Sequence, residues 1–300
     1  MMPKIETVAI AGASGTLGPH VFQALVNAGF RVSILTRSNK PGAYASNINV
    51  FEVDFNSVES LTSALKGVDA VVSTVGGAAV DNQTVLIDAA IAAGVKRFIP
   101  SEFGNVTTNP KVEKFPVYSS VFKIRNYLQE KAAAGQLSWT VLACGAFLDL
   151  VLNTPTLLDF QNHTVTILDE GDNRISSTSL PAVGRAIAAI LQNFDATENR
   201  VMHVSEAILT QNQLIGFAKE IRPDIEWSIS KEQSSLLLQE SLEEFGAGDF
   251  SVPTFMKLLK GTALAGDTYG AAFDVTDNEL LGIKELAPAD LKKLIAEKLA

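Results

Sequence analysis

The fold of this chain is decided by the stretch Val8-Ala9-Ile10-Ala11-Gly12-Ala13-Ser14-Gly15-Thr16-Leu17-Gly18. An apolar run long enough for one buried strand leads into glycines spaced three apart, and a helical pattern then opens at Pro19. Gly12 permits the unusual backbone torsions of a tight turn, and Gly15 leaves room for a phosphate group beside the backbone. Gly18 allows a strand and a helix to pack closely. The sequence therefore predicts a strand, a turn and a helix.

This glycine turn has the features of a dinucleotide-binding loop. Its glycines read GxxGxxG rather than GxGxxG, so the pattern alone is a weak signal. The context is stronger, because the turn follows a strand, opens a helix and lies within the first twenty residues. Free N–H groups at the start of such a helix attract phosphate. We expect the pyrophosphate of a dinucleotide to lie against Gly12, Ala13, Ser14, Gly15, Thr16, Leu17 and Gly18.

The composition describes a globular chain with an acidic surface. Of 300 residues, 47% are hydrophobic and 19% are charged, and the formal net charge is -9. A chain of this length can bury about three quarters of the surface that it exposes when unfolded. A nucleic acid or an acidic membrane surface repels a protein of this charge, so we expect neither as a partner.

The cysteine and histidine content argues against a disulfide framework and against a metal site. Cys144 is the one cysteine and can form no internal disulfide, which fits a reducing compartment. The histidines lack the spacing of metal ligands, so we expect no metal at His20, His163 or His203. Residues 1–7 contain no long apolar segment of the kind found in secretory signals, and we expect a cytoplasmic protein.

Strands and helices alternate in the first half of the chain. Gly67, Gly94 and Gly135 each suit the left-handed position that ends a helix, and each precedes an apolar run typical of a buried strand. With the first strand and the runs at 30–36 and 48–54, they predict six strands through about residue 143. Such alternation indicates an α/β fold with a Rossmann-type, doubly wound parallel sheet. Ligands of these sheets bind at the carboxyl ends of the strands.

Beyond residue 150 the alternation weakens, which predicts a second part of the molecule. We expect an NAD(P)-binding domain over residues 1–150 and a smaller, mostly helical substrate-binding lobe over 151–300. The elements predicted there are strands at 163–168 and 201–204 and helices at 180–191, 211–220, 231–245, 252–260 and after Pro288. No linker separates the two parts, so we expect them to be fused.

The end of the second predicted strand indicates which dinucleotide binds. A carboxylate at this point hydrogen-bonds the ribose 2′-OH of NAD and rejects a 2′-phosphate. The sequence instead reads Thr36-Arg37-Ser38-Asn39-Lys40, with two cations and no carboxylate. Because an arginine can pair with phosphate through two N–H groups, we expect NADPH, with Arg37 and Lys40 at its 2′-phosphate. The alternative is that Arg37 is an ordinary solvated arginine.

Five motifs spread over most of the chain carry a family resemblance. They are the glycine turn, Ser73-Thr74-Val75-Gly76-Gly77, Arg97-Phe98-Ile99-Pro100-Ser101-Glu102-Phe103-Gly104, Ile124-Arg125-Asn126-Tyr127-Leu128 and Asp277-Asn278-Glu279-Leu280-Leu281-Gly282. These motifs resemble those of the NmrA-like and isoflavone-reductase-like branch of the atypical short-chain dehydrogenases. The sequence looks most like the fungal members, several of which the family associates with secondary metabolism.

The resemblance implies an NADPH-dependent reductase of aromatic or phenolic compounds. It also implies a helix lysine that donates a proton or activates the substrate, four residues before the arginine matched by Arg125. Val121 stands at that position in this chain. Lys123 is the nearest lysine, but at about 100° per residue it lies about 200° around the helix from Val121. Lys123 is therefore a candidate for catalysis or cofactor contact, and the alternative is an ordinary helix cation.

Two further side chains are candidates for acid–base chemistry. In the YxxxK pattern of short-chain dehydrogenases, a lysine one helical turn away lowers the pKa of a tyrosine. Tyr118 stands five residues before Lys123, and Phe122 occupies the position where the pattern has its lysine. Glu102 follows the fifth predicted strand, where a nicotinamide ring would lie. It is either an acid or a carboxylate that caps a helix or orients the backbone.

The remaining candidate cofactor contacts also follow strand ends. At the ends of the fourth and fifth predicted strands they are Thr74, Val75, Gly76, Ser101 and Phe103. The resemblance adds Arg125 and places Asp54 near the adenine, although an aspartate is also common in a turn.

These observations favour an NADPH-dependent reductase of an apolar or aromatic small molecule. Two alternatives stay open. One is a regulator that binds the dinucleotide without turning it over, because the family lysine is missing. The other is a redox-silent cyclase or isomerase that uses Glu102 or Tyr118 for proton transfer. The sequence leaves the substrate and the oligomeric state undetermined.

Overall fold

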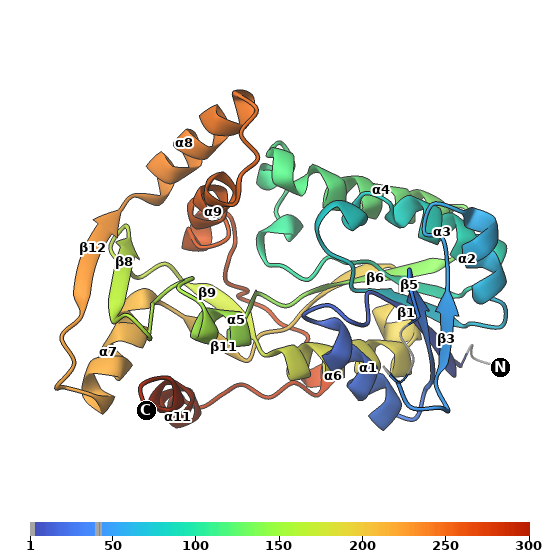
Figure 1. Ribbon diagram of the computed structural model, residues 1–300, viewed down its shortest axis with the longest axis horizontal. Helices are drawn as coiled ribbons and strands as arrows, with labels where there is room; N and C mark the ends of the chain where they lie inside the picture. Colours follow the sequence, from blue (N-terminus) through green and yellow to red (C-terminus); the bar gives the residue numbers. More distant parts are fainter. Residues whose placement is uncertain (1–3, 40–41, 43) are drawn as a thin grey trace.

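A parallel sheet of seven strands occupies one side of the molecule (Figure 1). The computed structural model describes residues 4–39, 42 and 44–300. In spatial order, the strands of this sheet are β10 (Arg200–His203), β6 (Ser138–Ala143), β5 (Arg97–Ile99), β4 (Ala70–Ser73), β1 (Thr7–Ala11), β2 (Arg31–Thr36) and β3 (Asn49–Glu52). The chain order reverses between β1 and β4, and an open α/β sheet binds its ligand at such a switch point.

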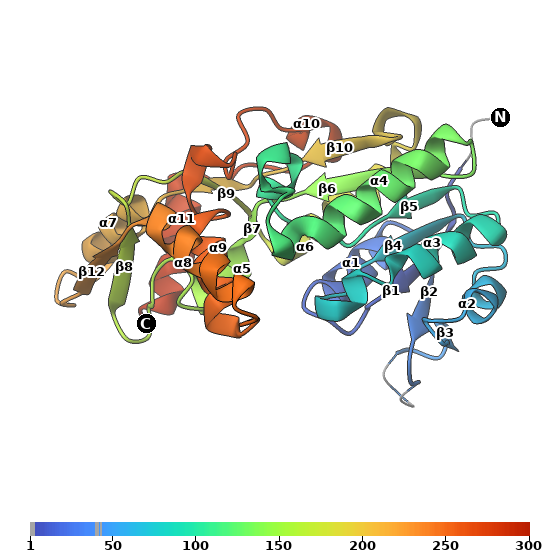
Figure 2. The ribbon, with the colours of Figure 1, turned by 90° about the horizontal axis from the view of Figure 1, so that it is seen from above.

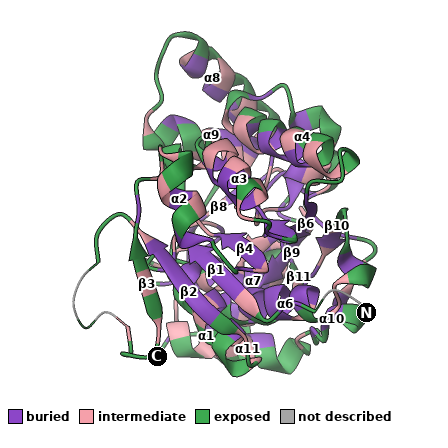
Figure 3. Cartoon of the chain, turned by 90° about the vertical axis from the view of Figure 1, so that its right-hand side faces the viewer, coloured by how far each residue is buried: buried purple, intermediate pink, exposed green. Residues whose placement is uncertain are grey.

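Helices cover both faces of this sheet (Figure 2). One face carries α1 (Gly18–Asn27) and α6 (Leu180–Gln192), and the other carries α2 (Val58–Ala64), α3 (Gln83–Ala92) and α4 (Ser119–Ala133). Because side chains alternate along a strand, Val8 and Ile10 pack on the first face and Ala9 and Ala11 on the second. Figure 3 shows β1, β2 and β4 buried at the centre. Strands covered on both faces have to be apolar throughout.

The predicted Rossmann-type sheet is confirmed. All six strands expected in the first half of the chain form, and β10 adds a seventh by pairing in parallel with β6. The sequence had assigned β10 and α6 to the later part of the chain. However, α6 packs on α1 so closely that a Cβ on Gly184 would lie 2.5 Å from the backbone oxygen of His20. The large sheet therefore takes one strand and one covering helix from beyond residue 150.

The rest of the chain forms a lobe beside the large sheet. Its strands are β7 (Ala146–Phe147), β9 (Ile175–Thr178) and β11 (Ala207–Leu209) in one small sheet and β8 (Thr164–Leu168) and β12 (Ser228–Glu232) in another. Its helices are α5 (Leu148–Asn153), α7 (Gln211–Ile221), α8 (Ser234–Gly246), α9 (Val252–Gly261) and α11 (Pro288–Lys298), and α10 (Asn278–Leu281) packs near α6. Among the described residues, no helix is long and apolar enough to cross a membrane.

One helix boundary in this lobe differs from the prediction. The sequence predicted a helix from Lys231, but Lys231 and Glu232 belong to β12 and the helix begins at Ser234. The backbone of Lys231 pairs with that of Ile167 in β8. Strand pairing with a segment more than sixty residues away therefore overrides the local helical pattern.

The apolar core of the lobe reaches back to the start of α4. Leu148 from α5 and Leu258 from α9 lie in one buried cluster with Tyr118 and Phe122. Val121 is half-buried and packs against the same cluster. The first turns of α4 therefore lie between the large sheet and the lobe.

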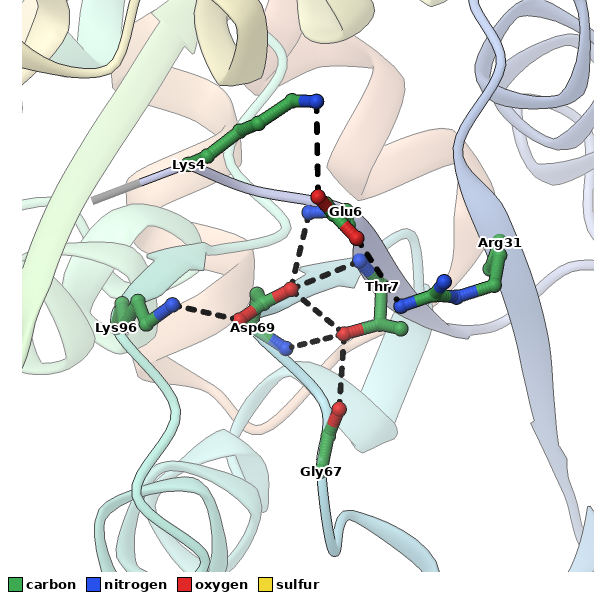
Figure 4. A network of polar contacts seen from close by, with 7 residues as sticks. All are labelled: Lys4, Glu6, Thr7, Arg31, Gly67, Asp69 and Lys96. Carbon is green, nitrogen blue, oxygen red and sulfur yellow. Dashed lines mark hydrogen bonds and ion pairs between the residues drawn. The ribbon is translucent and has the colours of Figure 1, made fainter. Parts of the chain in front are cut away.

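Polar side chains close the amino edge of the large sheet, as Figure 4 shows for Asp69. Its Oδ2 accepts hydrogen bonds from the N–H groups of Glu6 (2.9 Å) and Thr7 (3.0 Å) and from Thr7 Oγ1 (2.8 Å). Lys96 Nζ donates to Oδ1 at 2.7 Å. Partial burial opposes ionisation, but Lys96 and the other donors together hold the pKa of Asp69 well below its usual value. The network fixes the start of β1 against the start of β4.

Arg97 makes a second polar connection at the start of β5. Its side chain is fully buried, and Nε donates to Ser138 Oγ and Nη1 to Thr140 Oγ1, both at 2.7 Å. Nη2 donates to the backbone oxygen of Phe194 at 2.8 Å. Burial lowers the pKa of Arg97 to about 10, so the guanidinium stays charged at neutral pH. Arg97 thereby joins β5, β6 and the segment that follows α6.

The late motif that begins at Asp277 connects the start of α10 to β10 and to the residues that follow it. Asn278 Oδ1 accepts the N–H of Ser205 at 3.0 Å, and Asn278 Nδ2 donates to the Ser205 oxygen at 2.7 Å. The carboxylate of Asp277 accepts the Arg200 guanidinium at 2.7 Å and the N–H of His203 at 2.8 Å. This motif therefore has a structural role in this chain.

Candidate nucleotide-binding site

The turn predicted at Gly12 is present and is held by the neighbouring strand. Gly12 has a φ of +88°, which favours glycine. A Cβ on this residue would lie 2.7 Å from the carbonyl carbon of Thr74. Thr74 in turn donates its N–H (2.8 Å) and its Oγ1 hydroxyl (3.0 Å) to the Ala11 oxygen. The carboxyl ends of β1 and β4 therefore meet at a point where no side chain fits.

The other two glycines let the loop fold back on itself. A Cβ on Gly18 would lie 2.3 Å from the Gly12 oxygen, so α1 starts directly against the turn. Gly15 N–H donates to the Gly12 oxygen at 3.0 Å. Ser14, Gly15 and Thr16 form the exposed tip of the loop, and Ala13, Leu17 and Gly18 are buried.

The amino end of α1 opens beside this exposed tip. Leu17 precedes the helix, and its apolar side chain accepts no hydrogen bond; within the described residues no other side chain caps this end. Pro19 lies in the first turn, where its fixed φ suits a helix and its missing N–H costs nothing. The N–H groups of His20 and Val21 donate to the Leu17 oxygen at 3.1 and 3.2 Å, whereas among the described residues those of Leu17 and Gly18 have no hydrogen-bond partner and lie at the positive end of the helix dipole. This arrangement suits a pyrophosphate.

Arg37 lies just past the end of β2 with an exposed side chain. A carboxylate from the end of β3 holds the same loop, because Glu52 Oε2 accepts the N–H of Asn39 at 3.0 Å. Lys40 lies outside the described residues. Among the described residues of this loop, Arg37 is therefore a cation that lies close to the carboxyl end of β1. The nearby Glu52 carboxylate already accepts a backbone hydrogen bond.

Asp54 is exposed and lies just beyond β3. Its Oδ1 accepts the N–H of Asn56 at 2.9 Å, and its own N–H donates to Ser60 Oγ at 3.1 Å. These contacts are those of an aspartate that shapes a turn. Its contact with an adenine stays a prediction.

Hydrogen bonds connect the loops after β4, β5 and β6. Ser101 donates its hydroxyl to the Val75 oxygen at 2.5 Å and its N–H to Gln83 Oε1 at 2.8 Å. The oxygen of Phe103 accepts the Cys144 thiol at 3.4 Å, and burial raises the pKa of that thiol. The candidate contacts at this edge are half-buried or exposed: Thr74, Val75, Gly76, Ser101 and Phe103.

Glu102 and Arg125, predicted as an acid and a cofactor contact, are paired with each other. Arg125 donates through Nη2 to Glu102 Oε1 and through Nε to Oε2 at 3.3 Å. Arg125 Nη2 also donates to the Thr107 oxygen at 2.6 Å, and its guanidinium lies 4.8 Å from the centre of the Phe122 ring. Burial raises the pKa of Glu102, and Arg125 opposes that shift. The pair connects α4 to the loop after β5.

The Tyr118 hydroxyl makes a hydrogen bond to a residue of the lobe. The hydroxyl lies 2.7 Å from Thr262 Oγ1, just beyond α9. Thr262 Oγ1 donates to the Leu258 oxygen at 2.7 Å, so Tyr118 is the donor to Thr262. Burial raises the pKa of Tyr118 to about 12. Tyr118 thus holds its proton in a hydrogen bond between α4 and α9.

Lys123 lies on a different side of α4 from these groups. It is exposed and lines a surface hollow of about 520 Å³ with Phe122, Asn126 and Tyr127. Val121, at the position of the family lysine, is half-buried against the lobe. The structure therefore brings Tyr118, Val121 and Arg125 toward the lobe and the strand-end loops, and it does not bring Lys123 there. The roles predicted for these residues stay predictions.

Three partners in this region were not foreseen from the sequence. Thr107 and Thr262 bind Arg125 and Tyr118, and Asn105 Nδ2 donates to the Ala263 oxygen at 2.9 Å. Their contacts join residues from 18 to 158 positions apart. No local pattern signals such contacts, because each depends on how the loop after β5, α4 and the end of α9 are placed against one another.

The reversed strand order, the glycine turn and the open end of α1 define a Rossmann-type α/β protein. The model of the NmrA-like family matches residues 4–235. The chain therefore belongs to the NmrA-like family, and the resemblance inferred from its motifs is confirmed.

Known relatives agree with this placement. Oxidoreductase aprR of Aspergillus flavus is 32% identical over 281 residues, which cover 92% of this chain and 94% of the relative. An isoflavone reductase of Medicago sativa is 30% identical over 270 residues, covering 80% of this chain and 84% of that protein. The structure of the leucoanthocyanidin reductase–NADPH complex from Vitis vinifera matches with a TM-score of 0.76 at 20% identity, covering 98% and 99% of the two chains. This last likeness shows the fold alone.

Proposed function

We propose that this protein is an NADPH-dependent reductase of an apolar or aromatic small molecule. The observation that carries the proposal is the exposed Ser14–Thr16 tip beside the uncapped start of α1. Buried glycine contacts hold this tip at the switch point of the sheet. The names of its relatives, an oxidoreductase and an isoflavone reductase, support a redox reaction.

The 2′-phosphate of NADPH would bind at Arg37. Its side chain is exposed just past β2, and the nearby Glu52 carboxylate accepts a backbone N–H. A guanidinium that pairs with phosphate discriminates between NADPH and NADH, because only NADPH carries the extra phosphate. The leucoanthocyanidin reductase of similar fold was solved with NADPH, which supports the choice.

An apolar or aromatic substrate suits the surroundings of α4. Val121 and Phe122 lie against the apolar cluster of the lobe, next to the loop after β5 where a nicotinamide ring would lie. Apolar walls with few polar groups are typical of sites that bind such small molecules. The substrate would therefore lie between the strand-end loops and the lobe.

A fluorescence titration of nucleotide-free protein with NADPH and with NADH tests the cofactor assignment. Wild-type protein is expected to prefer NADPH. Arg37→Ala is expected to weaken NADPH binding by about 10- to 100-fold, the size of a lost charged hydrogen bond, and to leave NADH binding unchanged. Arg31→Ala, an exposed arginine at the amino end of the same strand, is the matched control. Equal losses for the two nucleotides with Arg37→Ala would contradict the assignment.

A regulator that binds NADPH without turnover is the second candidate. It is favoured by Val121 at the position of the family lysine and by the outward placement of Lys123. Such a protein would bind NADPH as tightly as a reductase does, but it would not oxidise NADPH whichever acceptor is supplied. Measuring NADPH oxidation with a panel of quinones, enones and aryl ketones therefore separates the two functions.

A further inference from the structure

Three ionisable side chains near the start of α4 and the adjoining strand-end loops are already engaged by partners within the protein. The Tyr118 hydroxyl donates to Thr262, and the Glu102 carboxylate accepts two N–H groups of Arg125. The Cys144 thiol is fully buried and donates to the Phe103 oxygen. To give a proton to a substrate, each of these groups would have to leave a partner that holds it in a buried environment.

Val121 occupies the point on α4 where a proton donor could reach this region. It lies one helical turn before Arg125 and so shares the face that contacts the loop after β5. Its side chain is half-buried against the lobe and has no ionisable group. Lys123, the nearest lysine, lies about 200° around the helix and is exposed.

This arrangement restricts which products can form readily. Reduction of an isolated ketone leaves an alkoxide, which is about as basic as hydroxide and needs an acid nearby, since the pKa of water is about 15.7. Reduction of a quinone leaves a phenolate, and the pKa of a phenol is only about 10. A phenolate can leave the site as an anion and take its proton from water.

We infer, building on the proposed reductase function, that the substrate is a quinone and that Val121 determines this preference over simple ketones, aryl ketones included, whose reduction leaves an alkoxide. In the reaction the quinone accepts one hydride from C4 of the nicotinamide, so that the C4–H bond breaks and a bond from that hydrogen to the quinone forms. The quinone gains two electrons and becomes a hydroquinone monoanion. One proton from water completes the hydroquinone, and NADP+ is the oxidised product.

The test compares NADPH-dependent reduction of 1,4-naphthoquinone and acetophenone by wild type, Val121→Lys and Val121→Met. We expect wild type to reduce the quinone with a kcat/KM at least about 100-fold above that for the ketone, because general acid catalysis contributes that much or more. Val121→Lys is expected to raise kcat for the ketone at least about 10-fold and to leave the quinone unchanged. Val121→Met, which has no acid, is expected to behave like wild type with both.

Because quinones are the more reactive acceptors, the selective gain with the ketone is the decisive result. Wild-type reduction of acetophenone as fast as the quinone, or a lysine variant that changes both acceptors alike or neither, would overturn the inference while leaving the reductase function intact. If none of the tested acceptors supports oxidation of NADPH, the reductase function itself would be overturned. Val121→His supplies a second donor at the same position if circular dichroism shows that the lysine variant is unfolded.

Discussion

The two edges of the large sheet use their polar groups in opposite ways. At the amino edge, the Asp69 carboxylate and the Arg97 guanidinium are satisfied by partners within the protein. At the carboxyl edge, the loop tip at Ser14–Thr16 is exposed and α1 begins without a side-chain cap. Satisfied polar groups stabilise the fold, whereas unsatisfied donors are available to a ligand. The polar networks at the amino edge and the proposed nucleotide site therefore lie at opposite ends of the strands.

Around the glycine turn, the carboxyl edge is stabilised by close backbone contacts, whereas the loops after β4 and β5 also make side-chain hydrogen bonds. Gly12 contacts Thr74 and Gly18 contacts Gly12 at distances that leave no room for a Cβ. Such contacts hold the turn in place, and among the described residues the N–H groups of Leu17 and Gly18 stay without a hydrogen-bond partner. The glycine turn at the carboxyl edge is therefore expected to be sensitive to added side-chain volume, and the amino edge to be sensitive to the loss of a charge.

Gly18→Ala is expected to have the largest effect. Its Cβ would lie 2.3 Å from the Gly12 oxygen and 2.6 Å from Ala13 Cα, so backbone has to move. We expect a loss of about 3 kcal/mol in the free energy of unfolding, together with loss of NADPH binding. Urea denaturation and nucleotide titration measure the two effects.

The matched control for this variant is Gly216→Ala in the middle of α7. A Cβ there meets no atom within 4 Å among the described residues, and alanine favours the helix by up to about 1 kcal/mol. This control is expected to stabilise the protein slightly and to leave binding unchanged. Wild-type stability in Gly18→Ala would show that the turn is not packed as described.

Asp69→Asn is expected to have the next largest effect, and it depends on pH. Because the pKa of Asp69 is lower in the folded than in the unfolded protein, its stabilisation is present above the unfolded pKa of about 3.9 and lost as pH falls further. At pH 7 the variant is expected to be about 2 kcal/mol less stable than wild type. The difference should shrink between pH 5 and pH 2, as followed by urea denaturation.

The control for this variant lies at the other edge of the sheet. Asp54 is exposed and accepts one local N–H, so Asp54→Asn is expected to change stability by less than about 0.5 kcal/mol at any pH. A stability difference for Asp69→Asn that stays constant from pH 7 to pH 2 would argue against a charge-dependent network at the amino edge.

Lys123→Ala is expected to have the smallest effect because this lysine belongs to neither edge. Its side chain is exposed on α4, so stability is expected to change by less than about 0.5 kcal/mol and NADPH binding not at all. Arg125→Ala, two residues further along the helix, is the positive control because it leaves the buried Glu102 without its cation. A large loss of turnover in Lys123→Ala would contradict this expectation and support the predicted catalytic role of Lys123.

The sequence predicted the large sheet, and the structure confirms it. Apolar runs after Gly67, Gly94 and Gly135 identified strands because a strand covered on both faces needs apolar residues throughout. The alternation did not show that β10 would return to the large sheet, since that depends on pairing with β6. Pairing partners are set by the whole fold and leave no mark on the local pattern.

The pairing of Glu102 with Arg125 illustrates the same limit at the site. Each residue by itself fits a role near a cofactor, as an acid or as a cation. Glu102 and Arg125 are 23 residues apart in the sequence, and their mutual hydrogen bonds form only when α4 packs over the loop after β5. The partner of Tyr118 is more distant still, 144 residues away on the far side of α9.

The sequence by itself determined the strand, glycine turn and helix at the start of the chain, the parallel sheet and the family. These features follow from local requirements: room for a backbone at Gly12 and Gly18, and apolar side chains in a buried strand. The tertiary structure decided which charges are engaged, which face of α4 turns toward the lobe and which lysine turns away. Those outcomes depend on contacts between distant segments, which exist only after the helices have packed.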